Sequence, residues 1–232
     1  MPTWGIHLAI AKKLSYKLNV EKNIFCISNL ITDIPNGYVI KNVTYPTPHS
    51  ITHFDKSMII DCHKATRIDI DGFYDKYHCK FNNPVMLGYY IHLLTDYYWN
   101  NKTYSEHGLF DKDGNRIGIK LNNGNNFICD KETSRIIKTN DFKLFSAYLY
   151  KNKIIEKLTF DEKVVDYLAD ITWMKIDVND INRTISYIND NCDGKNKILS
   201  NDEKDYYQIF SEENMLKEFD MCIDYILNRL NK

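Results

Sequence analysis

The chain has no long apolar run and no closely spaced cysteine pair. None of its segments reaches the roughly 18 uninterrupted apolar residues that a membrane-spanning helix needs, so we expect no transmembrane segment. Its six cysteines lie far apart without a Cys-x-x-Cys pair, which disfavours a disulfide framework and favours small buried side chains. The first residues also lack a basic stretch followed by an apolar core, so we expect no signal peptide and a cytoplasmic protein.

Net charge is almost absent as well. The chain carries 30 Lys and Arg against 31 Asp and Glu, which gives a formal net charge of −1. A protein with so little net charge has no global field that attracts long nucleic acids or an anionic membrane, so we expect any anionic partner to be held locally. The 232 residues are few enough to share one core, and we expect a single domain over residues 1–232.

Apolar residues recur at helical spacing along most of the chain. Thr3 is expected to cap a first helix that ends near Asn19, and Pro84 is expected to begin a long helix. The segment 115–129 has the pattern of a β-hairpin. These patterns predict an all-α, multi-helix bundle with one small β-hairpin insertion. Further helices are expected at 23–34, 57–78, 141–150, 161–173, 178–190 and 202–230.

One face of the helix expected to begin at Pro84 carries residues that could bind a metal ion. Gly88, His92 and Asp96 lie four residues apart and therefore share one face. An imidazole and a carboxylate one turn apart can bind the same divalent cation, and the glycine leaves room for another segment that carries ligands. The alternative is that Asp96 pairs with His92 or with a tyrosine hydroxyl only to satisfy its own hydrogen bonds.

Three further side chains are candidate ligands because of where they occur. His7 falls on the apolar face of the first helix, and Asp33 stands at the end of an apolar run before Pro35. An unpaired carboxylate in such surroundings is costly, although Asp33 could also serve only to turn the chain. His49 and His53 are four residues apart in an irregular loop, and we prefer His53 as the side chain that turns inward.

Other polar patterns predict less. His63 and His78 fall among Asp and Lys residues, so we assign both to the solvated surface. The segment Asp111–Asn115 resembles a calcium loop, but it lacks the terminal glutamate and is predicted to be a turn. His107 and Asp111 repeat the His-x-x-x-Asp spacing, but loop-like surroundings make a shared helical face doubtful.

The order of these motifs resembles the bacterial zinc-dependent phospholipase C family, especially its shorter members without a signal peptide. The likeness lies in Trp4 followed by His7, in Asp33 before Pro35, in the segment 50–54, and in the block 87–99 (Leu-Gly-Tyr-Tyr-Ile-His-Leu-Leu-Thr-Asp-Tyr-Tyr-Trp). It covers about the first half of the chain. The chain departs from the family because Trp4 is internal, no histidine follows His107, and the C-terminal third is predicted to be helical rather than a β-sandwich.

The resemblance implies an all-α fold shared with single-strand-specific zinc nucleases and a site for one or two zinc ions between helices. By the same resemblance Asp33 would also orient the attacking water, and Asp96 would bridge two ions. The aromatic side chains expected to line a substrate cleft are Tyr89, Tyr97 and Trp99. The implied ligands are His7, Asp33, His53, His92 and Asp96, with His49, His107 and Asp111 as possible additions.

The function expected from these features is hydrolysis of a phosphodiester or phosphomonoester, with a small phosphoester or a phospholipid as the substrate. Zinc-bound water has a pKa near 7 and supplies hydroxide at neutral pH. Two other functions remain open, namely a single-strand nuclease and a binding protein that keeps the metal or the scaffold without catalysis. The lack of an overall basic charge disfavours long polynucleotides as substrates.

Overall fold

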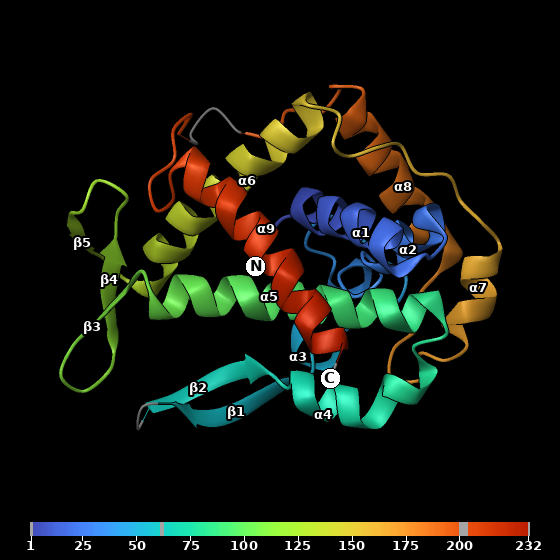
Figure 1. Ribbon diagram of the computed structural model, residues 1–232, viewed down its shortest axis with the longest axis horizontal. Coiled ribbons are helices and arrows are strands. Elements are labelled where there is room, and N and C mark those ends of the chain that lie inside the picture. Colours follow the sequence, from blue (N-terminus) through green and yellow to red (C-terminus); the bar gives the residue numbers. More distant parts are fainter. Residues whose placement is uncertain (1, 61–62, 200–203, 232) are drawn as a thin grey trace.

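The computed structural model describes residues 2–60, 63–199 and 204–231, with side chains except at 58–65. These residues are mostly helical, with two small sheets at one end of the molecule (Figure 1). The longer helices are α1 Trp4–Leu18, α2 Lys22–Ser28, α4 Ile70–Tyr77, α5 Pro84–Ser105, α6 Lys131–Lys151, α7 Lys163–Leu168, α8 Val178–Cys192 and α9 Glu212–Leu230. The shorter helices are η1 Ile34–Asn36, α3 His49–Thr52 and η2 His78–Lys80. The expectation of a mainly helical protein is confirmed.

Helix α5 runs through the middle of the molecule, between α4 below and α1 above (Figure 1). It begins where predicted, because the Asn83 side chain accepts hydrogen bonds from the backbone N–H groups of Val85 and Met86 and Pro84 occupies the first turn. Most of its first four turns are buried on all sides. The polar side chains on this part of α5 therefore lie inside the protein.

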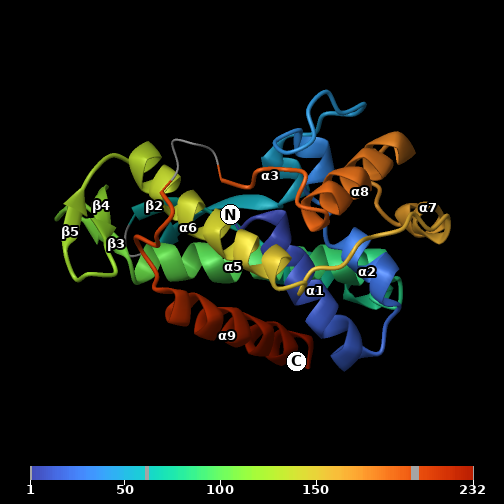
Figure 2. The ribbon, with the colours of Figure 1, turned by 90° about the horizontal axis from the view of Figure 1, so that it is seen from above.

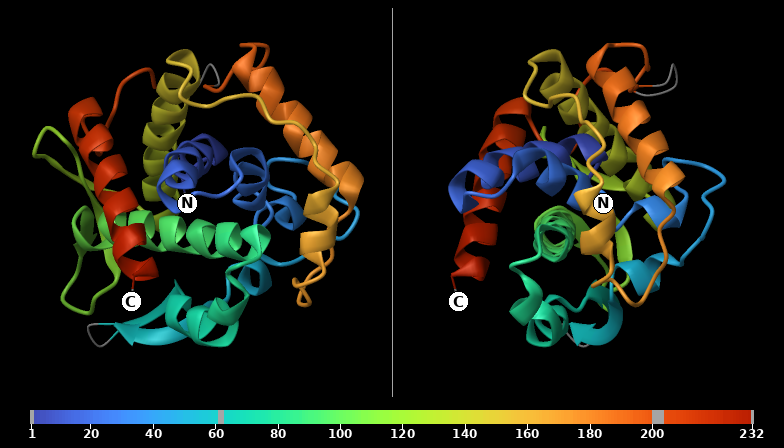
Figure 3. Two further views of the ribbon diagram at one scale, coloured as in Figure 1. Left: turned by 45° about the vertical axis from the view of Figure 1, so that its right-hand side comes forward. Right: turned by 90° about the vertical axis from the view of Figure 1, so that its right-hand side faces the viewer.

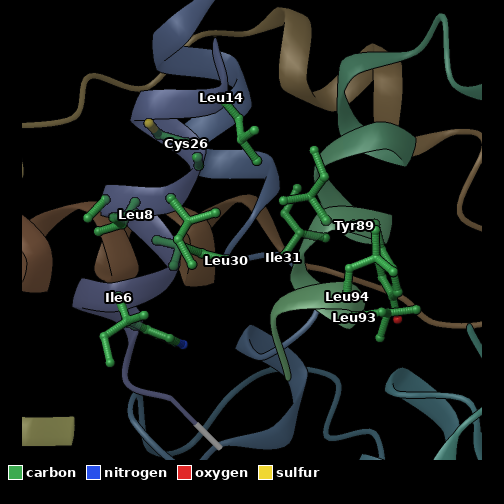
Figure 4. Close-up of a cluster of buried hydrophobic side chains, with 14 of the residues drawn as sticks. Ile6, Leu8, Leu14, Cys26, Leu30, Ile31, Tyr89, Leu93 and Leu94 are labelled. Atoms are coloured by element: carbon green, nitrogen blue, oxygen red, sulfur yellow. The ribbon is translucent and has the colours of Figure 1, made fainter. Parts of the chain in front are cut away.

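Helix α1 packs inside a ring of later helices. Helices α5, α6 and α9 surround it, and α8 closes the remaining side (Figures 2 and 3). Thr3 occupies the predicted N-cap position, and the helix ends one residue before Asn19, which has a left-handed backbone (φ 52°). Apolar side chains from α1, from α2 and the turns after it, and from α5 meet in the core shown in Figure 4, where Leu8, Leu30 and Leu94 are labelled.

Gly88 allows α2 and α5 to approach closely. A Cβ atom at this position would lie 2.5 Å from the Ser28 Cβ and 3.1 Å from the Ser28 carbonyl carbon. Both distances are shorter than ordinary van der Waals contact, so no larger residue fits without moving a helix. The close approach also brings the end of α2 next to His92, one turn further along α5.

The expected helix at 57–78 is wrong over most of its length. Residues Asp55–Ile60 (β1) and His63–Ile68 (β2) form an antiparallel hairpin in which Asp55 pairs with Ile68. Only residues 70–77 are helical, beginning after Asp69, whose side chain caps the backbone N–H of Gly72. The β-branched residues of this segment (Ile59, Ile60, Thr66 and Ile68) favour strands, and this preference overrode the apparent helical spacing.

The predicted hairpin at 115–129 is confirmed and is part of a three-stranded sheet. Strands β4 Arg116–Lys120 and β5 Asn126–Ile128 pair antiparallel, and β3 Gly108–Phe110 adds on the other side of β4. In the turn before β4, one Asp111 carboxylate oxygen accepts hydrogen bonds from the backbone N–H groups of Asp113 and Asn115. The segment is therefore a turn, as predicted.

Smaller expectations have mixed outcomes. The described cysteines form no disulfide with one another, but Cys79 is exposed rather than buried. His78 is exposed, as predicted, whereas the side chain of His63 lies outside the described residues. Among the helices that the structure describes, none combines the length and apolar character needed to cross a bilayer.

Candidate metal centre

Five side chains from four segments converge beside α5. His7 comes from α1, Asp33 from the turn before η1, and His53 from the end of α3, and they meet His92 and Asp96 of α5. Two overlapping groups, His7–His92–Asp96 and Asp33–His53–His92, each have their ligand atoms within 4.8 Å of one another. The sequence predicted these five residues as ligands, and the structure brings all of them together.

Four ligand atoms lie around the pair formed by the His53 and His92 imidazoles. The Nε2 atoms of His53 and His92 are 3.2 Å apart. Asp96 Oδ2 lies 3.1 Å from the first and 3.5 Å from the second. Asp33 Oδ1 lies 3.4 Å and 3.8 Å from the same two nitrogens. Bonds of about 2.0–2.1 Å to a tetrahedral ion place ligand atoms about 3.3–3.4 Å apart, and these five distances are near that separation.

Hydrogen bonds fix which nitrogen of each imidazole faces this centre. His92 Nδ1 lies 2.7 Å from the backbone oxygen of Asn29. A carbonyl oxygen only accepts, so Nδ1 carries the proton. The lone pair of neutral His92 is therefore on Nε2, the atom that faces His53 and Asp96. Metal-binding histidines are commonly oriented in this way by a second partner.

A chain of hydrogen bonds gives His53 the same tautomer. The Asn36 side-chain NH₂ donates to Asp33 Oδ1 at 3.2 Å, so its carbonyl oxygen accepts from the Thr52 hydroxyl at 3.0 Å. Having donated its proton, the Thr52 oxygen accepts from His53 Nδ1, which lies 2.9 Å away. The lone pair of neutral His53 is then also on Nε2.

Two nitrogen lone pairs consequently meet 3.2 Å apart in a buried place. His53 and His92 are both fully buried, so water cannot separate the two nitrogens. Lone pairs at this distance repel unless a cation lies between them, either a shared proton or a metal ion. Because one carboxylate oxygen of Asp96 and one of Asp33 lie beside the same two nitrogens, a metal ion is favoured over a single proton.

His7 and the second oxygen of Asp96 form an adjacent position. His7 stacks on His92 with ring centroids 4.0 Å apart, and its Nε2 lies 3.3 Å from Asp96 Oδ1. Among the described residues, neither nitrogen of His7 and neither oxygen of Asp96 has a well-aligned hydrogen-bond partner, although all four atoms are buried. Unsatisfied buried polar atoms are rare in folded proteins, so their occurrence together is consistent with metal ligands. Asp96 is placed to bridge two ions.

The protonation states of the cluster suit a cation. Burial lowers the pKa of His7, and the neighbouring His92 lowers it further. Burial also lowers the pKa of His53, in spite of Asp96 and Asp33. Burial opposes ionisation of Asp96, yet the three surrounding imidazoles outweigh it and hold its pKa well below the usual range. At neutral pH His7 and His53 are therefore neutral imidazoles beside a charged carboxylate, the state in which these groups bind metals.

The pKa values of His92 and Asp33 are shifted more by neighbouring charged groups than by burial. Burial lowers the pKa of His92, but the negative charges of Asp33 and Asp96 outweigh it and raise the pKa overall. Burial favours protonated Asp33, but His92 and His53 hold its pKa below the usual value. Metal-free His92 is consequently the imidazole of this group that takes up a proton most readily.

A large cavity reaches the centre on one side only. It has a volume of about 970 Å³, and Asp33 lines it, whereas the other four ligands do not. The Asp33 side chain is 12 % exposed, while the side chains of His7, His53, His92 and Asp96 are fully buried. The Trp4 indole donates to Asp33 Oδ2 at 3.0 Å and lines the same cavity. Solvent and any substrate therefore reach the centre past Asp33.

The possible additional ligands do not join the cluster. His49 stacks on His53 at 3.7 Å and its Nδ1 lies 3.0 Å from Asp55 Oδ2, at the cavity wall. His107 packs its ring against Phe210 at 4.9 Å, beside the second sheet. Asp111 holds the turn before β4. Each is committed to a different local structure, so the described clusters contain only the five central residues.

The predicted aromatic cleft is only partly present. Tyr97 lines the cavity, but Tyr89 and Trp99 do not. Tyr89 is fully buried, and its hydroxyl donates to the Thr52 backbone oxygen and accepts from the Trp173 indole at 3.1 Å. Trp99 is fully buried against other aromatic rings. Both side chains are core because α5 is surrounded by helices on those faces.

The sequence did not predict the groups that orient the candidate ligands. The indole of Trp4, the backbone oxygen of Asn29, and the side chains of Asn36 and Thr52 each contact a ligand. Thr52 directly precedes His53, and Asn36 follows Asp33 by three residues, which is the only signal that the sequence offers for them. A backbone oxygen leaves no sequence signal at all.

Comparison of the chain with models of protein families, with curated proteins and with solved structures found no match.

Proposed function

We propose that this protein is a zinc-dependent phosphoester hydrolase that resembles zinc-dependent phospholipase C. The single observation that carries the proposal is the close approach of His53 Nε2, His92 Nε2 and Asp96 Oδ2, with Asp33 Oδ1 beside the same two nitrogens. Imidazole and carboxylate ligands at these separations match zinc. The position between His7 and Asp96 Oδ1 supports a second ion, as the resemblance implies.

The ligand charges support this choice of chemistry. Asp33 and Asp96 bring two negative charges, which balance one divalent ion and leave a second ion with positive charge for a phosphate. When bound, zinc lowers the pKa of water to about 7 and attracts phosphoryl oxygens. The buried imidazoles stay neutral and hold the site rigid, since His53 and His92 are each anchored through Nδ1.

Asp33 is the residue that meets the substrate side. Its Oδ2 accepts from the Trp4 indole and its Oδ1 accepts from Asn36, so the carboxylate is fixed while one edge remains open to the cavity. A carboxylate held in this way can orient a water molecule toward a phosphorus atom and accept a proton from it. Tyr97 lines the same cavity and offers a ring face to an organic group.

The proposal is tested by activity of the purified, zinc-loaded protein. Three substrates separate the candidate functions: bis-p-nitrophenyl phosphate, a choline phospholipid and single-stranded DNA. We expect hydrolysis of bis-p-nitrophenyl phosphate in proportion to bound zinc, measured by elemental analysis, and loss of activity with a chelator. Cleavage of the DNA alone would indicate the nuclease. Full zinc occupancy with no turnover of any substrate would contradict the proposal and indicate a binding protein.

A further inference from the structure

The cavity that reaches the metal centre has a basic wall, which the metal site does not explain. Of the charged side chains that line the cavity, five are basic and only two, Asp33 and Asp55, are acidic. This excess contrasts with the whole chain, whose net charge is −1. The side chains of this basic wall are Arg67, Lys131, Arg135, Lys138 and Lys143.

Arg67, on β2, is half-buried, and none of the described carboxylates forms an ion pair with it. Its guanidinium lies over the ring of Tyr104, 4.4 Å from the centroid, and this contact covers one face. Its Nε atom is buried and has no hydrogen-bond acceptor among the described residues. A partly desolvated guanidinium with an unused donor costs free energy, because the lost hydration is not replaced.

Lys138, on α6, is in the same situation. It is half-buried, and its Nζ makes a long contact, 3.4 Å, with the side-chain oxygen of Asn100. No carboxylate lies within 4.0 Å of it in the part of the chain that the structure describes. Burial lowers the pKa of Lys138, and the nearby Arg116 and Arg135 lower it further. The lysine thus lies in a region already crowded with positive charge.

Arg116, on β4, adds a third cation behind the wall. Its Nη2 atom is buried without an acceptor among the described residues, and burial lowers its pKa. Three elements that are far apart in sequence (β2, β4 and α6) therefore each bring a half-buried cation to the end of α5 nearest the sheets. Arg135 differs from these three, because it is exposed and donates to Glu132 at 2.9 Å.

We propose that the basic wall binds a second phosphate of the substrate, so that the preferred substrates are small organic bisphosphates. This inference rests on the proposed function, in which the first phosphoryl group lies at the metal centre beside Asp33. Guanidinium and ammonium groups are the usual partners of phosphate, and their charge-assisted hydrogen bonds replace the hydration lost on burial. One cavity contains both the basic wall and Asp33.

The dimensions favour a small molecule over a polymer. A volume of about 970 Å³ is at the upper end of the range typical of small-molecule sites. The cavity is also lined by aromatic rings, Trp4, Tyr97, Tyr150 and Tyr187 among them, which suit an organic ring between the two phosphates. A nucleoside bisphosphate has this size and this placement of charge, whereas a long strand would need a basic surface outside the cavity.

The test compares adenosine 3′,5′-bisphosphate with adenosine 5′-monophosphate in titration calorimetry. It uses the full chain both with zinc and without zinc, because binding at the basic wall does not require catalysis. We expect the bisphosphate to bind about tenfold more tightly, as expected for one added set of charge-assisted contacts. The variant R67Q/K138Q should lose this preference, and the control K17Q, at an exposed lysine of α1, should keep it.

The folding of the variants is checked by thermal unfolding. Because Arg67 and Lys138 have no anionic partner among the residues that the structure describes, their replacement should leave Tm unchanged or raise it, whereas a structural role would lower it. Equal binding of the two nucleotides, equal effects of K17Q and R67Q/K138Q, or tighter binding of a single-stranded 20-mer would each overturn the inference. Absence of hydrolysis with the bisphosphate preference intact would overturn the proposed function alone.

Discussion

The two carboxylate oxygens of Asp96 face different histidines. Oδ2 faces His53 and His92, while Oδ1 faces His7. The residue is fully buried, so its charge cannot be stabilised by solvent. Such a carboxylate must be balanced by protons on the imidazoles or by bound cations, and the choice between these depends on metal availability and pH.

Replacing Asp96 tests the centre most directly. In Asp96→Asn the neutral amide neither bridges two cations nor balances their charge. We expect zinc affinity to fall by more than the roughly 10–100-fold that accompanies loss of a ligand's orienting partner, and activity to fall with it. Zinc content is measured by elemental analysis after dialysis. The matched control Asp75→Asn, at an exposed carboxylate of α4, should keep both properties, and unchanged zinc in Asp96→Asn would remove Asp96 from the site.

Protons and zinc compete for the histidine nitrogens, so zinc affinity should depend on pH. The pKa shifts of the histidines determine the direction of this dependence. The pKa of His92 is raised, so the metal-free protein is partly protonated there near neutral pH, and the metal must displace that proton. The pKa values of His53 and His7 are lowered, so their protons compete only in more acidic solution. Zinc affinity should therefore fall as pH decreases from 8 to 5, with a net release of protons on binding at pH 7.

Calorimetry in buffers with different ionisation enthalpies measures this proton release. Zinc binding that releases no proton at pH 7, or an affinity that does not weaken in acid, would contradict the assignment of the three imidazoles as ligands.

At the residue scale the sequence predicted which five side chains would meet but not their surroundings. His92 and Asp96 share a helical face, and polar residues in apolar surroundings, such as Asp33 and His7, are costly without partners, so spacing and burial made them candidates and the family resemblance implied the full set of five. Arg67 and Lys138 gave no such signal, because lysine and arginine are ordinarily solvated and nothing in a sequence says that a surface is folded over them. The tautomers also depend on a backbone oxygen, which belongs to no particular residue type.

At the element scale the contact between α2 and α5 depends on one missing side chain. Gly88 lets Ser28 lie against the helix backbone, and the Asn29 side chain donates to the Gly88 carbonyl oxygen at 3.1 Å. The same contact brings the Asn29 carbonyl oxygen to His92 Nδ1. The spacing of two helices therefore determines the orientation of a ligand.

Gly88→Ala should disturb both stability and metal binding. The added Cβ would lie 2.5 Å from the Ser28 Cβ, and overpacking of this kind costs about 1–3 kcal/mol, partly offset by the roughly 1 kcal/mol that alanine gains in a helix. We expect a net loss of about 1 kcal/mol in the free energy of unfolding, measured with urea, and weaker zinc binding because His92 loses its anchor.

The double variant Gly88→Ala/Ser28→Gly provides the control. It removes the closest contact but keeps the added Cβ 3.1 Å from the backbone of residue 28, so a partial recovery is expected. Full stability in the single variant would show that the two helices separate without cost.

Helices and strands whose ends are marked by capping or turn residues were predicted well, and those without such residues were not. Asn83 and Pro84 mark the start of α5, and the turn at 122–125 marks the hairpin. The segment 57–78 has no glycine or proline between its two strands, so its apolar residues matched a helix as well as a hairpin. Pairing of β1 with β2 settles the choice, and such pairing is a contact between residues that spacing alone does not encode.

At the scale of the whole molecule, the cluster ties together segments that are distant in the chain. Its ligands come from α1, from the turn after α2, from α3 and from α5, and all these segments pack on one core. A ligand that binds only the folded protein stabilises it by mass action, so metal binding and folding are linked.

Zinc should therefore raise the thermal stability of the protein. At a free concentration 100 times Kd the gain is about 2.7 kcal/mol, which for a chain of this length corresponds to roughly 5–10 °C in Tm. Differential scanning calorimetry with zinc and with a chelator measures the difference, and Asp96→Asn should show little of it. The same Tm with and without metal would mean that the folded protein does not bind zinc.

The cavity is lined by two regions of the chain. Every candidate ligand lies within residues 7–96, as does Arg67, whereas Lys131, Arg135, Lys138, Lys143 and the rings of Tyr150 and Tyr187 come from α6 and α8. If the proposed function holds, mutations in α6 and α8 would change which substrate binds without altering the candidate metal ligands. A lineage built on this scaffold would then be free to diversify its substrates by drift in α6 and α8 while its inorganic chemistry stayed constant.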